Sequence, residues 1–263
     1  MENNSAIVIF DSGLGGLSVW REIRVLLPHE NLIYLADSAN CPYGPKKETE
    51  IKARAFACAE FLLSKGCKTI VVACNTATAA AIDDLRRRFN VPFIGMEPAV
   101  KPAALNSKTG HVGILATQGT FNGRLFKETS QKFASNVELH VQVGHGLVEL
   151  VEKGETNTER AASLLREYIG PMLDKNIDYL VLGCTHYPFL SEAIEKITLG
   201  RVHLIDPAPA VARRLKEIFN QNSIGFSSDL TPEFQFYSNG DKKLMQEFLQ
   251  NFLKVKAEVF SWG

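Results

Sequence analysis

Two cysteines of this chain lie in matching local sequences. Cys74 belongs to VVACNTATA (residues 71–79), and Cys184 belongs to VLGCTHYPF (residues 181–189). Each cysteine follows a short apolar run, typical of a buried strand, and precedes small polar residues that begin a predicted helix. The positive end of a helix dipole lowers the pKa of a neighbouring thiol and attracts anions. We therefore expect each cysteine to be a reactive thiol beside an anion-binding site.

Three further cysteines and two other uses of a cysteine pair compete with this interpretation. The chain has five cysteines at irregular spacing: Cys41, Cys58, Cys67, Cys74 and Cys184. Cys58 and Cys67 are interpreted as small buried apolar residues. A zinc site formed by Cys74, Cys184 and His186 is one alternative, although the spacing indicates no fourth ligand. A redox dithiol is the other, although the sequence contains no CxxC.

Two loops add polar groups near the predicted strand ends. DSGLGG (residues 11–16) is not a dinucleotide-binding fingerprint, because Ser18 occupies the third glycine position of GxGxxG. Its glycines let a small anion approach backbone amides, and Asp11 would suit an ammonium group. CPYG (residues 41–44) is a turn whose Tyr43 and Gly44 amides would suit an anion, although it also fits a simple loop.

Predicted strands and helices alternate along the chain and must position these groups. Apolar runs predict strands at 6–10, 31–36, 68–73, 91–95, 111–116, 137–143, 178–183, 201–206 and 234–239. Helical patterns occur at 15–27, 47–65, after 75, after TQGTFNGR (117–124) to about 135, at 146–153, at 156–174, after 184, at 208–220 and at 241–253. This alternation is typical of an α/β fold with mostly parallel sheets and crossover helices.

The same pattern occurs twice in the chain. Strand 6–10 with its glycine loop matches strand 111–116 with TQGTFNG, and the strand before Cys74 matches the strand before Cys184. We predict two pseudo-symmetric three-layer α/β domains, with the site in the cleft between them at the carboxyl ends of the strands. Residues 1–98 and 207–263 form the first domain, and residues 99–206 form the second. GMEPAVKPA (95–103) and DPAPA (206–210) are the expected crossings.

Composition excludes several classes of protein. Basic and acidic residues both number 29, so the formal charge is zero and no nucleic-acid surface is expected. The triplet at 86–88, Arg-Arg-Arg, is interpreted as a solvated helix end. The sequence contains no apolar run long enough to span a membrane, and MENNSA at its start lacks a signal-peptide pattern. We expect a cytoplasmic protein with reduced thiols and no membrane partner.

Four segments together resemble glutamate racemase of the cofactor-independent aspartate/glutamate racemase superfamily. They are FDSGLGG (10–16), ADSANCPYG (36–44), ACNTATA (73–79) and GCTHYP (183–188), in the family's order. The resemblance implies a two-base racemase that uses neither pyridoxal phosphate nor a metal. One cysteine thiolate removes the α-proton of glutamate, and the other cysteine protonates the opposite face. It assigns D-glutamate to Cys74 and L-glutamate to Cys184, and it implies a supply of D-glutamate for bacterial peptidoglycan.

The resemblance also implies roles for particular residues. The substrate contacts would be Asp11, Ser12, Tyr43, Gly44, Asn75, Thr76, Thr185 and His186. Asp11 would assist Cys74, His186 would assist Cys184, and Glu152 in GLVELVEKG (146–154) would lie near the histidine. The preceding VQVGHG departs from the family pattern, and its His145 is interpreted as structural or interfacial. Cys41 is interpreted as a bystander, and the family implies a homodimer.

Other functions remain open beside this one. Aspartate racemase, hydantoin racemase and arylmalonate decarboxylase share the expected fold. A decarboxylase needs one cysteine, so the pair argues against it, and DSGLGG with GCTHYP favours glutamate over aspartate. A catalytically idle binding protein and a zinc-binding structural protein are the alternatives from other classes. The intact pair of thiols, together with Asp11 and His186, favours an active enzyme.

Overall fold

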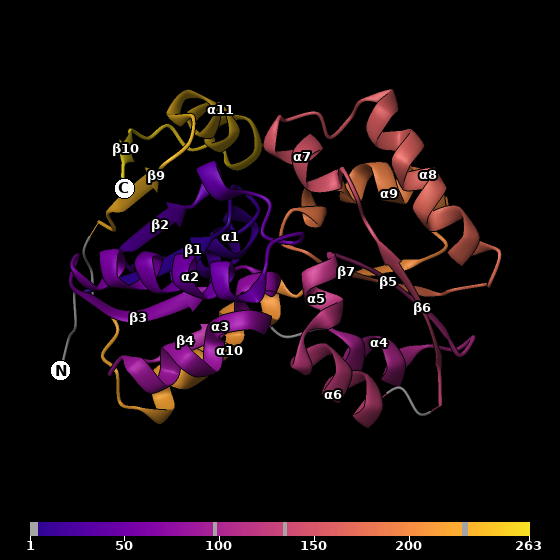
Figure 1. Ribbon diagram of the computed structural model, residues 1–263, viewed down its shortest axis with the longest axis horizontal. Coiled ribbons are helices and arrows are strands. Elements are labelled where there is room, and N and C mark those ends of the chain that lie inside the picture. Colours follow the sequence, from indigo (N-terminus) through magenta and orange to yellow (C-terminus); the bar gives the residue numbers. More distant parts are fainter. Residues whose placement is uncertain (1–4, 97–98, 134–135, 228–230) are drawn as a thin grey trace.

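A six-stranded parallel sheet forms the first lobe of the computed structural model, which describes residues 5–96, 99–133, 136–227 and 231–263 (Figure 1). Its inner strands are buried on both faces, which explains why their sequences are continuous apolar runs. In spatial order the strands are β10 (Val259–Ser261), β9 (Phe234–Ser238), β2 (Leu32–Ala36), β1 (Ala6–Asp11), β3 (Cys67–Val72) and β4 (Phe93–Gly95).

A four-stranded parallel sheet forms the second lobe. In spatial order its strands are β6 (Glu138–Val143), β5 (His111–Ala116), β7 (Tyr179–Gly183) and β8 (His203–Ile205). Numbered along the chain within each lobe, the order is 2-1-3-4 here and also in the β2-β1-β3-β4 part of the first sheet. The predicted duplication is thus confirmed in the topology, and β9 and β10 extend only the first sheet.

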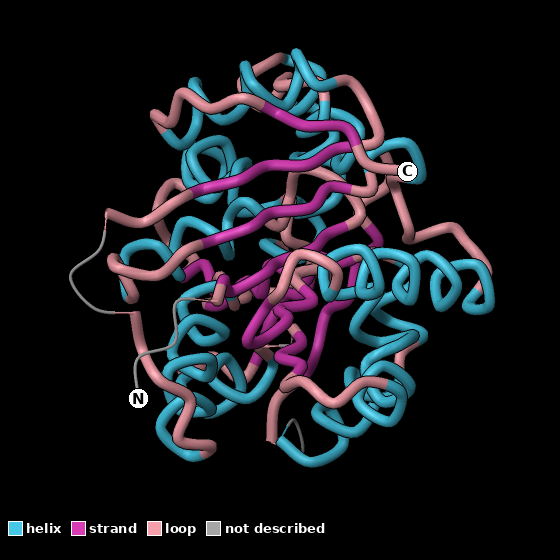
Figure 2. Tube along the Cα trace, turned by 90° about the vertical axis from the view of Figure 1, so that its left-hand side faces the viewer, coloured by secondary structure: helices cyan, strands magenta, loops and turns pink. Residues whose placement is uncertain are grey.

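Helices cover both faces of each sheet, so each lobe has three layers (Figures 1 and 2). The first lobe contains α1 (Leu17–Leu26), η1 (Ser38–Asn40), α2 (Glu48–Leu63), α3 (Asn75–Arg88), α10 (Ala208–Gln221) and α11 (Lys242–Leu253). The second contains α4 (Val100–Asn106), α5 (Gln118–Asn122), α6 (Arg124–Phe133), α7 (Leu147–Glu152), α8 (Glu159–Leu173), η2 (Tyr187–Leu190) and α9 (Ser191–Thr198). The predicted α/β fold with parallel sheets is confirmed.

Several short elements were not predicted from the sequence, among them η1, α4, α5 and β10. Helix α4 lies in the Pro-rich segment interpreted as a simple crossing, and Pro102 fits there because a helix tolerates proline in its first turn. Strand β10 has three residues and forms by pairing with β9, so a sequence pattern hardly marks it. The predicted domain boundary at 98/99 touches residues outside the described part, and the boundaries stay a prediction.

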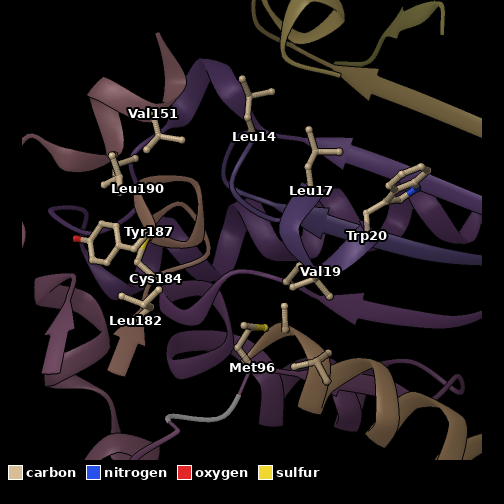
Figure 3. Packing of buried hydrophobic residues seen from close by; sticks show 14 of the residues in the cluster. Leu14, Leu17, Val19, Trp20, Met96, Val151, Leu182, Cys184, Tyr187 and Leu190 are labelled. Carbon is tan, nitrogen blue, oxygen red and sulfur yellow. The ribbon is translucent and has the colours of Figure 1, made fainter. Parts of the chain in front are cut away.

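The largest apolar core continues from one lobe to the other. It joins Leu14 and Leu17 near the glycine loop to Val151 of α7 and Leu190 of η2 (Figure 3). The Cys184 side chain lies within this cluster beside Tyr187. The Cys184 sulfur is therefore held in place by apolar residues of both lobes. Among the helices that the structure describes, none has the length and apolarity needed to cross a membrane.

Candidate active site

The predicted site residues meet where the carboxyl ends of β1, β3 and β7 come together. Cys74 follows β3 of the first lobe, and Cys184 follows β7 of the second. The Thr185 hydroxyl donates to Asp11 Oδ2 across the lobes at 3.1 Å, and the Ser18 hydroxyl donates to the Thr185 carbonyl at 3.2 Å. These bonds bring the two pseudo-equivalent strand ends into one buried polar site.

Cys74 is the N-cap residue of α3. Its Sγ accepts a hydrogen bond from the Ala77 amide at 3.4 Å and lies 3.7 Å from the Ser12 hydroxyl. Burial nevertheless raises the pKa of the Cys74 thiol far above its ordinary value, and the Asp11 carboxylate raises it further. The expectation of a lowered pKa is therefore wrong for Cys74, because desolvation outweighs the helix terminus. This sulfur holds its proton near neutral pH.

Cys184 has a different partner, His186. The Cys184 sulfur lies 3.7 Å from Nδ1 of His186, and Nε2 of that ring lies 2.6 Å from Oε1 of Glu152. In the imidazolium, Nε2 donates to the Glu152 carboxylate, whereas in the neutral ring protonated at Nδ1 it accepts from the Gly15 amide at 3.2 Å. Burial lowers the pKa of His186, but the hydrogen bonds to Cys184, Cys41 and Glu152 raise it more, so the net pKa lies well above its usual range. An imidazolium facing Sγ stabilises negative charge there.

Glu152 reaches this position from the second lobe although the preceding segment departs from the family pattern. Its Oε1 accepts from the Leu14 amide of the glycine loop at 2.6 Å as well as from His186. The side chain therefore joins α7 to the loop after β1. The structure brings Glu152 into contact with the predicted histidine, as the resemblance implied.

His186 also gives a prediction about stability and pH. A histidine whose pKa rises on folding adds to the free energy of unfolding. This contribution is complete at pH values below the ordinary imidazole pKa of about 6.5, and it is lost as pH rises through the folded-state pKa. Between about pH 6 and about pH 8 the wild type should lose several °C more in melting temperature than His186→Gln, because one pKa unit is about 1.4 kcal/mol.

Thermal unfolding followed by circular dichroism measures this difference. His29→Gln, an exposed histidine in the loop after α1, is the matched control and should follow the wild type. Equal pH slopes for the wild type and His186→Gln would show that His186 does not gain its proton affinity on folding.

Asp11 is fully buried at the end of β1. Its Oδ1 accepts from the Gly13 amide at 2.9 Å, and its Oδ2 accepts from Thr185. Burial raises the pKa of Asp11, although the nearby His186 charge lowers it in part. A buried carboxylate with two neutral donors retains capacity for a cationic partner, such as an ammonium group.

Asn75 begins α3 and has an unpaired donor. Its Nδ2 is buried and makes no hydrogen bond to any residue that the structure describes, and the residue is 6% exposed. A buried amide donor without a partner is costly unless a ligand satisfies it. The neighbouring Thr76 hydroxyl lies 2.9 Å from the hydroxyl of Thr117 in the second lobe. Asn75 and the first turn of α3 thus offer donors for a carboxylate.

The predicted Tyr43 and Gly44 contacts lie on a loop anchored by Asp37. The Tyr43 hydroxyl donates to Asp37 Oδ2 at 2.5 Å, and Arg54 binds both oxygens of this carboxylate. Burial raises the pKa of the Tyr43 phenol far above its usual range, so the hydroxyl stays protonated and acts as a structural donor. The side chain of Tyr43 is occupied in this bond, which leaves the backbone amides for a ligand.

Cys41 lies near the site, as expected from its place before Pro42 and Tyr43. The Cys41 Sγ, a Glu152 carboxylate oxygen and a His186 ring nitrogen all lie within 4.8 Å of one another. Burial raises the pKa of Cys41 to about 12. The interpretation of Cys41 as a bystander in the chemistry stays a prediction. Within the described residues, Cys74, Cys184 and His186 do not converge as one ligand set, so the structure contradicts that zinc alternative.

Gly15 gives a steric prediction. A Cβ added there would lie 2.2 Å from Nδ1 of His186, so the ring must move away from Cys184. We expect Gly15→Ala to lower turnover by about 10²-fold, the size reported for displacements near 1 Å in active sites. Gly170→Ala in α8 is the control, because nothing lies within 4 Å of its Cβ, and it should leave turnover unchanged. Steady-state rates of the two purified variants test this prediction. Wild-type turnover in Gly15→Ala would contradict the close packing of His186 against Gly15.

A cavity of about 360 Å³ adjoins the site at Gly44 and Thr117. The divergent segment forms its other wall through Gly144 and His145. The His145 side chain is exposed, while its carbonyl accepts from the Tyr168 hydroxyl at 3.0 Å. His145 therefore has a structural backbone contact, and its ring is at the edge of this cavity.

The model of the Asp/Glu/Hydantoin racemase family matches residues 18–215, which is most of the chain. The chain belongs to this family. The resemblance seen in the four sequence segments is thereby confirmed. Among relatives in the racemase family, a glutamate racemase of Ectopseudomonas mendocina is 43% identical over 98% of both chains. A glutamate racemase of Roseiflexus is 48% identical over 85% of this chain and 84% of the relative.

Solved structures of racemases share the fold. A glutamate racemase from Bacillus anthracis matches with a TM-score of 0.89 at 31% identity, covering 98% of this chain and 97% of that one. A glutamate racemase from Francisella tularensis, solved in complex with D-glutamate, matches with a TM-score of 0.85 at 31% identity, covering 99% and 98%.

Proposed function

We propose that this chain is a glutamate racemase that interconverts L- and D-glutamate with Cys74 and Cys184 as its two bases. The observation that supports this most directly is the pair of thiols at pseudo-equivalent strand ends. Each has its own ionisable neighbour: Asp11 beside Cys74, and His186 beside Cys184. Inversion at one carbon requires a proton acceptor on one face and a donor on the other, and a duplicated fold supplies both. The names of the relatives agree with this substrate.

The proposed proton transfers are described from L-glutamate, with Cys184 as the base. His186 as imidazolium stabilises a thiolate on Cys184, which removes the α-proton of L-glutamate and becomes a thiol. The electron pair left on the α-carbon spreads into the substrate carboxylate. The Cys74 thiol, which holds its proton through burial, then delivers it to the opposite face and becomes the thiolate. The product is D-glutamate, and the reverse reaction exchanges the two roles.

The remaining site residues hold the substrate for these transfers. The unpaired amide of Asn75 and the first turn of α3 would bind a carboxylate where negative charge develops. The Thr185 hydroxyl would contribute to the same carboxylate by leaving its bond to Asp11. The Ser12 hydroxyl and the Tyr43 and Gly44 amides would bind the other carboxylate. Asp11 would bind the ammonium, and that positive charge offsets the effect of Asp11 on Cys74. This scheme requires protein groups only and uses no cofactor.

Circular dichroism of glutamate incubated with the purified chain tests the proposal. L-glutamate and D-glutamate should both converge on a racemic mixture without added cofactor. In D₂O, early product should carry deuterium while recovered substrate does not, because different thiols remove and deliver the proton. Racemisation of aspartate or a hydantoin but not glutamate would overturn the substrate, and no racemisation at all would overturn the proposal.

The physiological setting proposed here is supply of D-glutamate for peptidoglycan in a bacterial cytoplasm, by a homodimer. The five cysteines are free, and thiol catalysis is favoured in a reducing compartment. Growth of a D-glutamate-requiring bacterial strain after expression of this chain would test the role. Light scattering of the purified chain tests the dimer, and a monomer mass at assay concentration would exclude it.

A further inference from the structure

Three metal-ligating side chains converge at the end of the second sheet away from the thiols. They are His111 at the start of β5, and Glu138 and His140 on the neighbouring edge strand β6. Their ligand atoms lie within 4.8 Å of one another. Nδ1 of His111 and Nε2 of His140 are 3.1 Å apart, and the Glu138 oxygens lie 3.7 and 3.9 Å from these two nitrogens.

Strand pairing fixes the three positions. His111 pairs directly with Glu138 in the parallel register, and His140 follows two residues after Glu138. Side chains two apart on a strand point to the same face of the sheet, so all three share one face. Along the strands, His111 lies roughly 17 Å and His140 roughly 10 Å from the carboxyl ends of β5 and β6, the edge of the sheet that bears the thiols. The cluster is therefore separate from the catalytic centre.

The geometry resembles a metal site more than ordinary strand packing. Two nitrogens bound to zinc at about 2.0–2.1 Å in a tetrahedral arrangement lie roughly 3.3 Å apart, close to the separation seen here. The two rings are stacked, with centroids 5.3 Å apart, and they present Nδ1 of His111 and Nε2 of His140 next to each other. The Glu138 side chain is 66% exposed and can move the small distance needed to close the set. A water molecule would complete four ligands.

We propose that His111, Glu138 and His140 bind a divalent transition-metal ion of the Zn²⁺ class. Two imidazoles with one carboxylate favour such ions over Mg²⁺ or Ca²⁺, which prefer oxygen ligands alone. The bound ion joins edge strand β6 to β5 and stabilises the second lobe, because it binds the folded chain and not the unfolded one.

Titration of the purified, chelator-treated chain with Co²⁺ and Zn²⁺ tests the proposal. Cobalt bound to nitrogen and oxygen lacks the strong ultraviolet thiolate band of cobalt bound to cysteine. The spectrum therefore distinguishes binding at this cluster from binding at the other group of metal-ligating side chains, which is Cys41, Glu152 and His186. The titration is repeated in Cys41→Ser to remove that second set. We expect one ion per chain, no thiolate band in Cys41→Ser, and a Zn²⁺-dependent rise in melting temperature.

Three variants make the test specific. His111→Ala/His140→Ala should weaken binding by well over tenfold and abolish the rise in melting temperature, since even outer-shell changes cost about 10–100-fold. Glu138→Gln, on an exposed side chain, should weaken binding by at least about tenfold without disturbing the fold. His203→Ala, on edge strand β8 of the same sheet, is the control and should bind as the wild type. Unchanged affinity in Glu138→Gln and the double variant, or no binding by the wild type, would overturn the proposal.

Discussion

Cys74→Ser and Cys184→Ser should each lower the rate of glutamate racemisation by about 10²–10⁴-fold. This is the usual contribution of a positioned acid–base group. Serine has nearly the shape of cysteine, but its hydroxyl is a far weaker acid and cannot supply the thiolate. Both sulfurs act in every turnover under the proposed mechanism, so neither variant should retain the wild-type rate. Circular dichroism with each enantiomer as the starting substrate measures the loss.

The two directions give an internal check on this result. L- and D-glutamate have the same free energy in water, so kcat/KM must fall equally from both sides in either variant. Exchange of the α-proton with D₂O separates the two thiols. Cys184→Ser should exchange D-glutamate faster than L-glutamate through Cys74, and Cys74→Ser should show the reverse preference.

Cys67→Ser is the matched control for both variants. Cys67 begins β3, and Cys74 follows the other end of the same strand, so the two thiols share a backbone element. Cys67→Ser should therefore racemise glutamate at the wild-type rate. A wild-type rate in Cys74→Ser or Cys184→Ser would exclude a two-thiol mechanism, whereas an equal loss in Cys67→Ser would indicate a general effect on folding.

Asp11→Asn should lower turnover by at least about 10²-fold while making the Cys74 thiol more acidic. The buried Asp11 charge adds to the raised pKa of Cys74, so its removal should lower that pKa. If Asp11 only tuned the thiol, the variant would have more thiolate at Cys74 and a higher kcat with D-glutamate as the substrate. We expect it to be slower in both directions, because the ammonium group of the substrate loses its counter-ion.

Alkylation rates at Cys74, resolved by peptide mass spectrometry across a pH series, report the thiol pKa separately from turnover. Asp178→Asn is the control, because the Asp178 carboxylate accepts from Ser107, Lys108 and Thr109 far from the thiols. That variant should unfold at a lower temperature and keep the wild-type kcat. Faster racemisation by Asp11→Asn would show that Asp11 does not bind substrate.

The sequence predicted most strands and the duplication because both are local patterns. Continuous apolar runs such as β1 and β3 are typical of buried parallel strands and could be recognised directly in the sequence. Cys74 and Cys184 each come shortly after such a run. Strand β10 and helix α4 were missed because they are short and depend on neighbours for their stability. Residue identities in the four segments also indicated which side chains would meet, and those side chains do converge.

Properties that depend on burial were beyond the reach of the sequence. The position of Cys74 suggested a lowered pKa, whereas the enclosed site raises it, and only the fold determines that balance. The sequence placed Cys41 near the site, but its contact with His186 and Glu152 depends on tertiary structure. The alternation in VELHVQV indicated a strand, but the meeting of His140 with His111 requires the strand pairing.

The contacts that join the lobes are the same contacts that set the charges of the site. Leu14 with Glu152, and Asp11 with Thr185, each link the first lobe to the second. Parting of the lobes to admit a substrate would break these bonds and expose His186 and Asp11 to water, where their pKa values would return toward ordinary ones. Closure of the lobes would then raise the pKa of His186, so the ring would take up a proton as the lobes meet. A lower pH would therefore favour the closed arrangement. The protonation states of the site therefore belong to the closed arrangement, and they would be lost each time the lobes part between turnovers.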